Sequence, residues 1–143
     1  MRQVAVFDTN VLLSGVGWKG KPFQCLELAR SGTVEGVMCQ EIIDELAEKL
    51  PAKLSVSAEA VTEILADLLS FLSVVTITNQ LLVIAADPDD DKVLECAVIG
   101  NATHIVSGDK RHLLPLGTYQ GIRIVSPAEF LQLVASSSSQ QTP

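Results

Sequence analysis

Positive charge is scarce in this chain of 143 residues. It has 10 lysines and arginines against 17 aspartates and glutamates, which gives a formal net charge of −7. Proteins that bind nucleic acid in a general way normally present a basic face. The balance therefore argues against a general nucleic-acid binder, and any polyanionic substrate has to be held locally, by a metal ion and a few cations.

Cysteines and long apolar runs are also few. The three cysteines are odd in number, lie in apolar surroundings and show no CxxC or Cys/His spacing: Cys25, Cys39 and Cys96. This pattern is typical of reduced, buried thiols in a cytosolic protein. No run approaches the ~18 apolar residues of a membrane span, and Asp8 and Asn10 interrupt the apolar N-terminus, which has no small-residue cleavage site. We therefore expect a soluble, cytoplasmic protein without a membrane partner.

Length and patterning predict one domain of the α/β class. A chain that is 48% hydrophobic at this length can build one core but not two ordinary domains. Strands are predicted at 4–7, 34–38, 74–77, 104–107 and 122–125, and helices between or after them at 22–31, 40–50, 57–72, 87–99 and from 126. This alternation predicts a three-layer α/β/α sandwich with a mostly parallel central sheet. The domain is expected to span 1–135, followed by a disordered polar tail at 136–143.

Two aspartates follow closely after predicted strands. Asp8 comes after the strand at 4–7, and Asp109 comes after the strand at 104–107. Each has an ordinary explanation, because Asp8 can cap a helix that starts near Asn10 and residues 107–109 form a turn signal. Open parallel sheets bind ligands beyond the carboxyl ends of their strands, so the shared position predicts that both acids converge there. Converging carboxylates repel each other and need a cation or a proton between them.

Two further groups of acids lie on predicted helices. Asp87, Asp89, Asp90 and Asp91 surround a helix start, where capping and the helix dipole explain two or three of them without a ligand. Asp90 is the best candidate for a site, because it lies seven residues before Ala97 and shares a related face of the helix with it. On the helix at 40–50, periodicity does not distinguish among the acids off the apolar stripe, which are Glu41, Asp44, Glu45 and Glu48.

Four segments in order closely resemble the PIN-domain family. They are residues 6–14, 41–46, 87–97 and 104–110, and they extend over nearly the whole ordered chain. Four spaced motifs in the right order are far more specific than any one of them. The resemblance is closest to the toxin components of toxin–antitoxin pairs, of which VapC-type ribonucleases are the best known.

The resemblance implies an acidic pocket that binds Mg²⁺ or Mn²⁺ and cuts single-stranded RNA, leaving 5′-phosphate and 3′-hydroxyl ends. Carried over residue by residue, it assigns the catalytic role to Asp8, Glu45, Asp90 and Asp109. The metal ligands among these are expected to be Asp8, Asp90 and Asp109. The residues expected to support these acids are Thr9, Asn10 and Ser107, together with Asp91, which either replaces or supplements Asp90.

Substrate phosphates need local cations. The candidates for RNA contact are Lys110 and Arg111, directly after Asp109, and the loop residues Trp18, Lys19 and Lys21. Trp18 either stacks on a base, as aromatic residues of single-strand binders do, or belongs to an ordinary solvent-facing loop. Cleavage by a pair of imidazoles without metal is a poor fit, because one of the two histidines, His104, lies in a predicted strand.

The sequence fits more than one kind of partner and more than one function. Toxins of the resembled family are commonly homodimers that a small antitoxin silences, and the apolar stripes at 40–50 and 57–72 fit such an interface or the domain's own core. An aspartate-based phosphotransfer domain would use Asp8 as nucleophile or phospho-acceptor. A noncatalytic PIN-like interaction module would keep the acids only as helix caps. A phosphoaspartate on Asp8 would indicate the first rival, and failure to bind Mn²⁺ would indicate the second.

Overall fold

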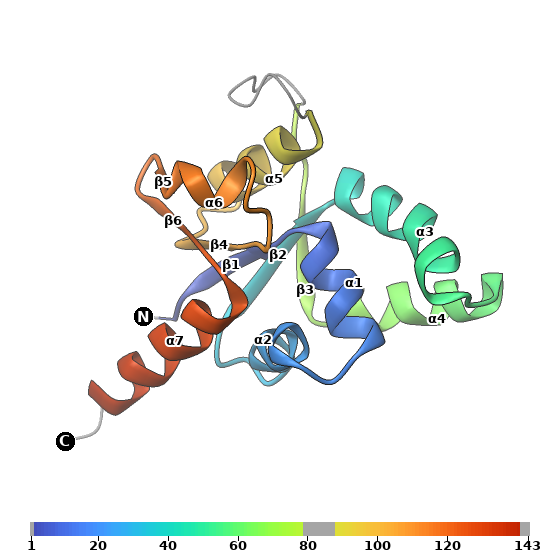
Figure 1. Cartoon of the computed structure of the whole chain (residues 1–143), viewed down its shortest axis with the longest axis horizontal. Coiled ribbons are helices and arrows are strands. Elements are labelled where there is room, and N and C mark those ends of the chain that lie inside the picture. Colours follow the sequence, from blue (N-terminus) through green and yellow to red (C-terminus); the bar gives the residue numbers. More distant parts are fainter. Residues whose placement is uncertain (1, 79–87, 141–143) are drawn as a thin grey trace.

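A computed structural model describes residues 2–78 and 88–140 of the chain (Figure 1). Six strands form one sheet in the order β3-β2-β1-β4-β6-β5. Their bounds are β1 (Val4–Phe7), β2 (Glu35–Cys39), β3 (Leu72–Val75), β4 (His104–Val106), β5 (Thr118–Tyr119) and β6 (Ile122–Val125). Every neighbouring pair is parallel except β5 with β6, so the prediction of a mostly parallel sheet is confirmed.

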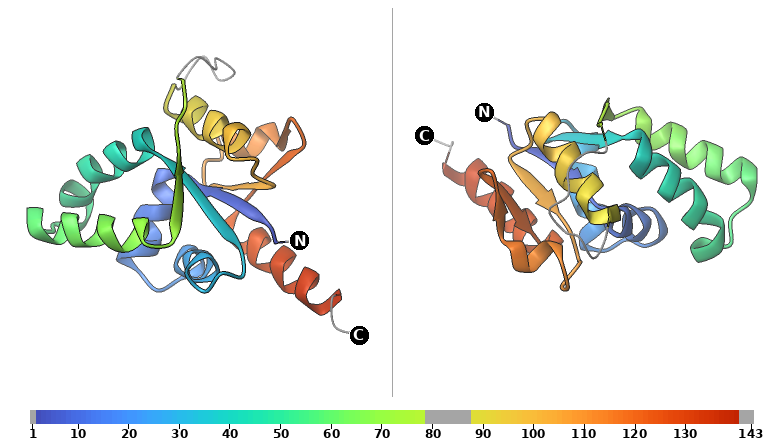
Figure 2. Two further views of the ribbon diagram at one scale, coloured as in Figure 1. Left: turned by 180° about the vertical axis from the view of Figure 1, so that it is seen from behind. Right: turned by 90° about the horizontal axis from the view of Figure 1, so that it is seen from above.

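Helices cover both faces of this sheet (Figure 2). They are α1 (Thr9–Gly17), α2 (Lys21–Arg30), α3 (Gln40–Leu54), α4 (Ala58–Leu69), α5 (Pro88–Ile99), α6 (Leu113–Leu116) and α7 (Pro127–Gln140). Successive strand residues point to opposite faces, and in β2 Gly36 faces Ala29 of α2 whereas Val37 faces Gly100 at the end of α5. Helices α2 and α5 therefore lie on opposite faces, and α1 and α7 pack beside α2.

One apolar core joins these layers. Its largest fully buried side chains include Phe7 of β1, Leu94 of α5 and Phe130 of α7, and the rings of Phe7 and Phe130 meet edge to face with centroids 6.4 Å apart. All three cysteines are free and buried, as the sequence predicts. None of the helices in the described ranges has the length and apolar character to span a membrane.

The prediction that the helix beginning at residue 40 ends at residue 50 is wrong, because the helix continues past Pro51. Helix α3 continues to Leu54 and ends at Ser55, which has a left-handed backbone (φ 55°) and donates its N–H to the Pro51 carbonyl. A proline inside a helix removes one backbone hydrogen bond. The extra turn brings the Leu54 side chain against α1 at Gly17, and this packing offsets the loss.

Other differences also have local causes. Strand β3 begins two residues before the predicted strand, because buried Leu72 pairs with Gly36 of β2. Gly15 and Gly17 lie inside α1, where Gly15 lets α1 approach Leu26 of α2 closely. The short α6 and β5 were not predicted, because elements of four and two residues carry too little periodicity to be recognised.

The C-terminal helix is longer than the sequence suggests. Helix α7 extends to Gln140 and so includes residues 136–140 of the segment predicted as a polar tail. The Gln3 side chain donates a hydrogen bond to the Ser137 hydroxyl at 3.0 Å and ties this part of the helix to the N-terminus. Asp87 and the tail residues 141–143 lie outside the described residues.

Candidate functional site

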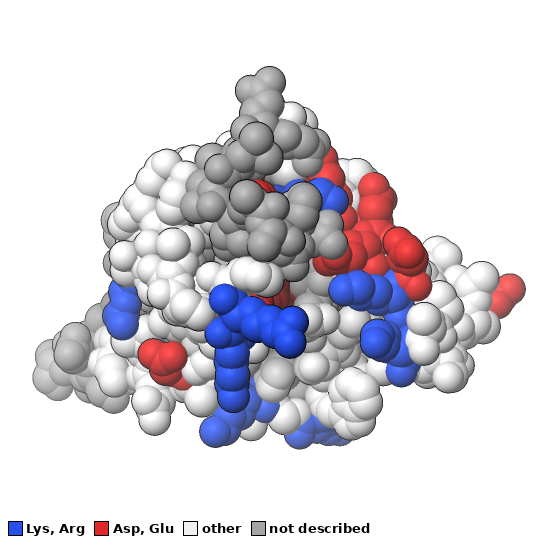
Figure 3. Space-filling model, turned by 45° about the horizontal axis from the view of Figure 1, so that its top comes forward, with Lys and Arg blue, Asp and Glu red and all other residues white. Residues whose placement is uncertain are grey.

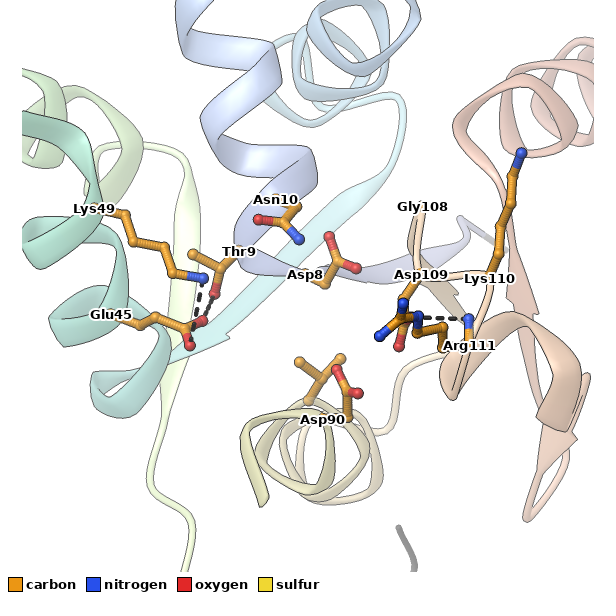
Figure 4. Close-up of a pocket in the computed structure, with 11 residues that line it drawn as sticks. Asp8, Thr9, Asn10, Glu45, Lys49, Asp90, Gly108, Asp109, Lys110 and Arg111 are labelled. Carbon is orange, nitrogen blue, oxygen red and sulfur yellow. Dashed lines mark hydrogen bonds and ion pairs between the residues drawn. The ribbon is translucent and has the colours of Figure 1, made fainter. Parts of the chain in front are cut away.

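A pocket of about 380 Å³ opens at the carboxyl ends of β1 and β4. On this side of the molecule acidic side chains gather next to basic ones (Figure 3). The four acids that the resemblance assigns all line the pocket, from four different parts of the chain: Asp8, Glu45, Asp90 and Asp109 (Figure 4). Its other lining residues are Thr9, Asn10, Lys49, Val93, Gly108, Lys110 and Arg111.

Asp8 is both a helix cap and a buried carboxylate of the pocket. Its Oδ1 accepts a hydrogen bond from the Val11 N–H at 2.9 Å at the start of α1, which confirms the capping interpretation. Its Oδ2 accepts a hydrogen bond from the Ser107 hydroxyl. The residue is only 5% exposed, and burial, with a smaller contribution from the charge of Asp109, raises the pKa of Asp8. A positive charge beside Asp8 would therefore stabilise the ionised form.

Ser107 links the two central acids. Parallel pairing of Phe7 with Val106 places Asp8 beside Ser107, and the Asp8 N–H donates to the Val106 carbonyl at 3.1 Å. The Ser107 hydroxyl donates to Asp8 and accepts from the Asp109 N–H at 2.9 Å. One fully buried side chain thus fixes the relative position of both carboxylates.

Asp109 is held by the backbone of the turn that follows it. Its Oδ1 accepts from the Arg111 N–H at 3.0 Å and its Oδ2 from the Leu113 N–H at 3.2 Å. Partial burial acts to raise the pKa of Asp109, but these N–H groups and a hydrogen bond with Asp90 outweigh it, so the pKa lies below its usual value. Asp109 is therefore an ionised, oriented carboxylate at neutral pH.

Asp90 approaches Asp109 from α5, on the opposite side of the pocket from α1. The two carboxylates are within hydrogen-bonding reach of each other, and both lie near the imidazole of His112. His112 Nδ1 is 3.2 Å from Asp90 Oδ2 and 3.7 Å from Asp109 Oδ2. Of the neighbouring acids in this run, Asp90 lines the pocket, whereas Asp91 is 4% exposed within α5.

Glu45 lies on the α3 wall, across the pocket from Asp109. Its Oε1 accepts a hydrogen bond from the Thr9 hydroxyl, and its Oε2 lies 3.9 Å from Lys49 Nζ (Figure 4). The sequence patterns did not indicate that Lys49 and His112 lie close to the pocket acids. Lys49 follows Glu45 by one helical turn, a spacing that places both on one face. His112 follows Asp109 by three residues, but the turn before α6 decides where its side chain points, and the sequence does not predict this.

A sequence profile of the PIN domain family matches residues 4–111, a span that contains all four pocket acids. The chain belongs to the PIN domain family. The fold of this PIN domain is similar to a chain of the VapBC2 complex from Rickettsia felis, which was crystallised bound to a DNA fragment from its promoter. The TM-score is 0.61 with 14% sequence identity, over 85% of this chain and 97% of that chain. At that identity the likeness speaks for the fold alone. Among curated proteins, none is significantly similar in sequence.

The predicted RNA-contact residues of this PIN domain divide into two groups. Lys110 and Arg111 line the pocket. Trp18, Lys19 and Lys21 lie at the other end of α1, the nine-residue helix whose first turn Asp8 caps, which places them roughly 13 Å further along its axis. Trp18 is 63% exposed there. Of the described residues that line the pocket, none comes from this second group.

The donor set of the pocket fits a hard divalent cation. Such ions prefer carboxylate oxygens, and Mg²⁺ usually binds one or two carboxylates and keeps several waters. Asp8, Asp90 and Asp109 offer these oxygens on one side of an open pocket, with room for water and a phosphate group. Asp90, Asp109 and His112 also form a group whose possible ligand atoms all lie within 4.8 Å of one another.

Proposed function

We propose that this PIN domain is a metal-dependent endoribonuclease that hydrolyses single-stranded RNA. The observation that carries the proposal is the convergence of Asp8, Asp90 and Asp109 on one pocket, from β1, α5 and β4. Three carboxylates held this close favour binding of a divalent cation. Family membership supports nuclease chemistry, and the ions proposed are Mg²⁺ or Mn²⁺.

Hydrolysis requires a water oxygen to attack phosphorus, the P–O3′ bond to break and the departing O3′ to gain a proton. A bound divalent ion supplies charge neutralisation at the phosphate and lowers the pKa of a coordinated water. Asp8, Asp90 and Asp109 are the proposed metal ligands, and Ser107 keeps two of them in place. Glu45, on the opposite wall, is proposed to accept a proton from the attacking water. The expected products carry 5′-phosphate and 3′-hydroxyl ends.

The cations around the pocket suit a single phosphodiester strand. Lys49 comes from the α3 wall, and Lys110 and Arg111 come from the turn after β4. They can contact phosphates on either side of the acids, and the acidic chain as a whole gives little other attraction to RNA. A pocket of about 380 Å³ has the dimensions of a small-molecule site. Trp18, Lys19 and Lys21 would meet RNA only if the strand continued along α1.

We also propose that the protein is the toxin of a toxin–antitoxin pair. The similar fold found in VapBC2 from Rickettsia felis, which was crystallised bound to a DNA fragment from its promoter, supports this proposal. By this proposal a cognate antitoxin blocks the pocket, and the toxin forms a homodimer in the cytoplasm. Co-expression with the product of a neighbouring small gene, followed by co-purification and relief of growth arrest, tests this part separately.

The phosphotransfer alternative is less well supported by the geometry. Both Asp8 oxygens accept hydrogen bonds, one from the Val11 N–H and the other from the Ser107 hydroxyl. A phosphoryl group on either oxygen would break one of these bonds. The alternative of a noncatalytic interaction module is tested by whether the purified protein cleaves RNA.

The test of the nuclease proposal is cleavage of end-labelled single-stranded RNA with Mg²⁺ or Mn²⁺. Wild type is compared with Asp109→Asn, and with Asp67→Asn as a matched control, because Asp67 pairs with Arg30 on the surface away from the pocket. We expect the wild type and the control to cleave equally and Asp109→Asn to lose at least about a hundredfold in rate. Equal cleavage by all three would trace the activity to a contaminant and refute the proposal.

A further inference from the structure

The imidazole of His112 lies next to two carboxylates of the acidic pocket. It directly precedes the four-residue helix α6, and the backbone amides at this turn are bound by Asp109. The His112 side chain instead faces the carboxylates of Asp90 and Asp109, at 3.2 and 3.7 Å from Nδ1. The imidazole thus lies between Asp109, in the turn after β4, and Asp90 of α5.

The spacing of these three donor atoms suits ligands of one ion. In an octahedral site with bonds of ~2.1 Å, adjacent ligand atoms lie roughly 3.0 Å apart, and in a tetrahedral zinc-like site they lie roughly 3.4 Å apart. The separations from Nδ1 to the two carboxylate oxygens bracket the tetrahedral value, and the shorter one is close to the octahedral value. Small side-chain shifts would bring all three atoms into one coordination sphere.

We propose that His112 Nδ1 is a direct ligand of the divalent ion, together with Asp90 and Asp109, and that it makes the pocket selective for transition metals over Mg²⁺. This inference rests on the metal dependence proposed above. Imidazole nitrogen favours first-row transition metals, whereas Mg²⁺ prefers oxygen ligands and retains its waters. An all-carboxylate pocket would lack this preference, so the histidine sets which ion the protein binds when both are present.

Pulsed EPR of Mn²⁺ bound to the full chain tests this directly. A coordinated imidazole gives a characteristic ¹⁴N coupling to the metal, and the chain has only two histidines. The other, His104, is buried against Phe130 and hydrogen-bonded to Thr103. We expect the coupling in the wild type and its loss in His112→Asn. Its absence from the wild type would overturn the proposal.

Calorimetric titrations give a second readout that does not depend on activity. We expect His112→Asn to weaken Mn²⁺ binding at least about tenfold, since even outer partners of metal ligands change affinity by that much. Mg²⁺ binding should change less than about threefold, because water can replace the imidazole. Equal losses for the two ions, or none, would contradict the selectivity. Thermal unfolding of the metal-free variant checks that it is folded.

The outcomes separate the two proposals. If Mn²⁺ binds the wild type and is lost in Asp109→Asn, but His112→Asn binds it unchanged, the metal centre stands and the role of His112 is refuted. If Mn²⁺ does not bind the wild type, the metal-dependent function itself is refuted. If Mn²⁺ binding shows the imidazole coupling but RNA is not cleaved, the ligand assignment stands and the nuclease proposal fails.

Discussion

Asp8→Asn is predicted to stabilise the metal-free protein while removing its metal binding. Asp8 is 5% exposed, and its pKa is raised in the folded state, chiefly by burial and further by the charge of Asp109. The unfolded chain therefore releases this proton at a lower pH than the folded protein does. The ionised carboxylate begins to destabilise the fold as the pH rises through about 3.9, the usual aspartate value. Above the folded-state pKa the destabilisation is complete.

Asparagine removes this charge and keeps the local structure. Its Oδ1 can still accept from the Val11 N–H at the start of α1, because asparagine caps helices about as well as aspartate. Its amide can donate to the Ser107 hydroxyl, which in the wild type donates to Asp8. We expect a gain of about 0.5–2 kcal/mol, the size that single stabilising substitutions commonly give. For a domain of this size, that corresponds to a rise in Tm of about 2–6 °C.

The assay is thermal unfolding at neutral pH, with chelator and then with Mn²⁺. In chelator the variant should melt above the wild type, and the difference should shrink below about pH 4, where Asp8 becomes protonated in both states. With Mn²⁺ at 100 times its Kd the wild type should gain about 2.7 kcal/mol, and the variant should gain much less. A variant that melts below the wild type in chelator would refute the reasoning.

Asp67→Asn is the matched control, and its expected effect has the opposite sign. A hydrogen bond from Arg30 lowers the pKa of Asp67 in the folded state. This pair therefore stabilises the fold above the usual aspartate pKa, and the stabilisation is lost as the pH falls. The side chains are 40% and 51% exposed, so the loss in the variant should stay below about 1 kcal/mol. The response to Mn²⁺ should equal that of the wild type.

Three further predictions concern the pocket and its support. Ser107→Ala should lower the cleavage rate about 10- to 100-fold and destabilise the protein by about 1–3 kcal/mol, because it removes the hydroxyl that holds both central acids. Steady-state kinetics measure the first effect and urea unfolding measures the second. Unchanged kinetics would show that Ser107 does not support the site. Lys110→Ala should weaken RNA binding and reduce the slope of log affinity against log salt by about one, and an unchanged slope would show that the lysine does not contact phosphate. Gly36→Ala should cost about 1–3 kcal/mol, because a Cβ there would collide with Leu72; an unfolding midpoint equal to wild type would contradict the packing described.

The sheet and the central acids were predictable because their signals are local. A buried run marks both β1 and β4, and an aspartate follows each, directly after β1 and three residues after Val106 of β4. The rule for ligand sites in parallel sheets then brings Asp8 and Asp109 together without any knowledge of contacts. The resemblance added Glu45, which helix periodicity alone did not distinguish from its acidic neighbours, and it supported Asp90, which the helical spacing already favoured.

The errors and omissions arise where tertiary contacts decide. Proline disfavours the interior of a helix, but α3 continues past Pro51 because Leu54 packs on α1. The approach of His112 to Asp90 joins residues from α5 and from the turn after β4, and no sequence period links them. Trp18 follows the pocket residues closely in sequence, but α1 separates it from them in space. The sequence thus predicted the acids better than the groups around them.

Calorimetric titration of Mn²⁺ into the metal-free protein tests the central claim most directly. Asp8, Asp90 and Asp109 line one pocket, so replacing any one of them by asparagine should weaken Mn²⁺ binding by at least about tenfold. Asp67→Asn should bind Mn²⁺ as the wild type does. Binding that is absent from the wild type, or that survives all three pocket substitutions unchanged, would contradict the account.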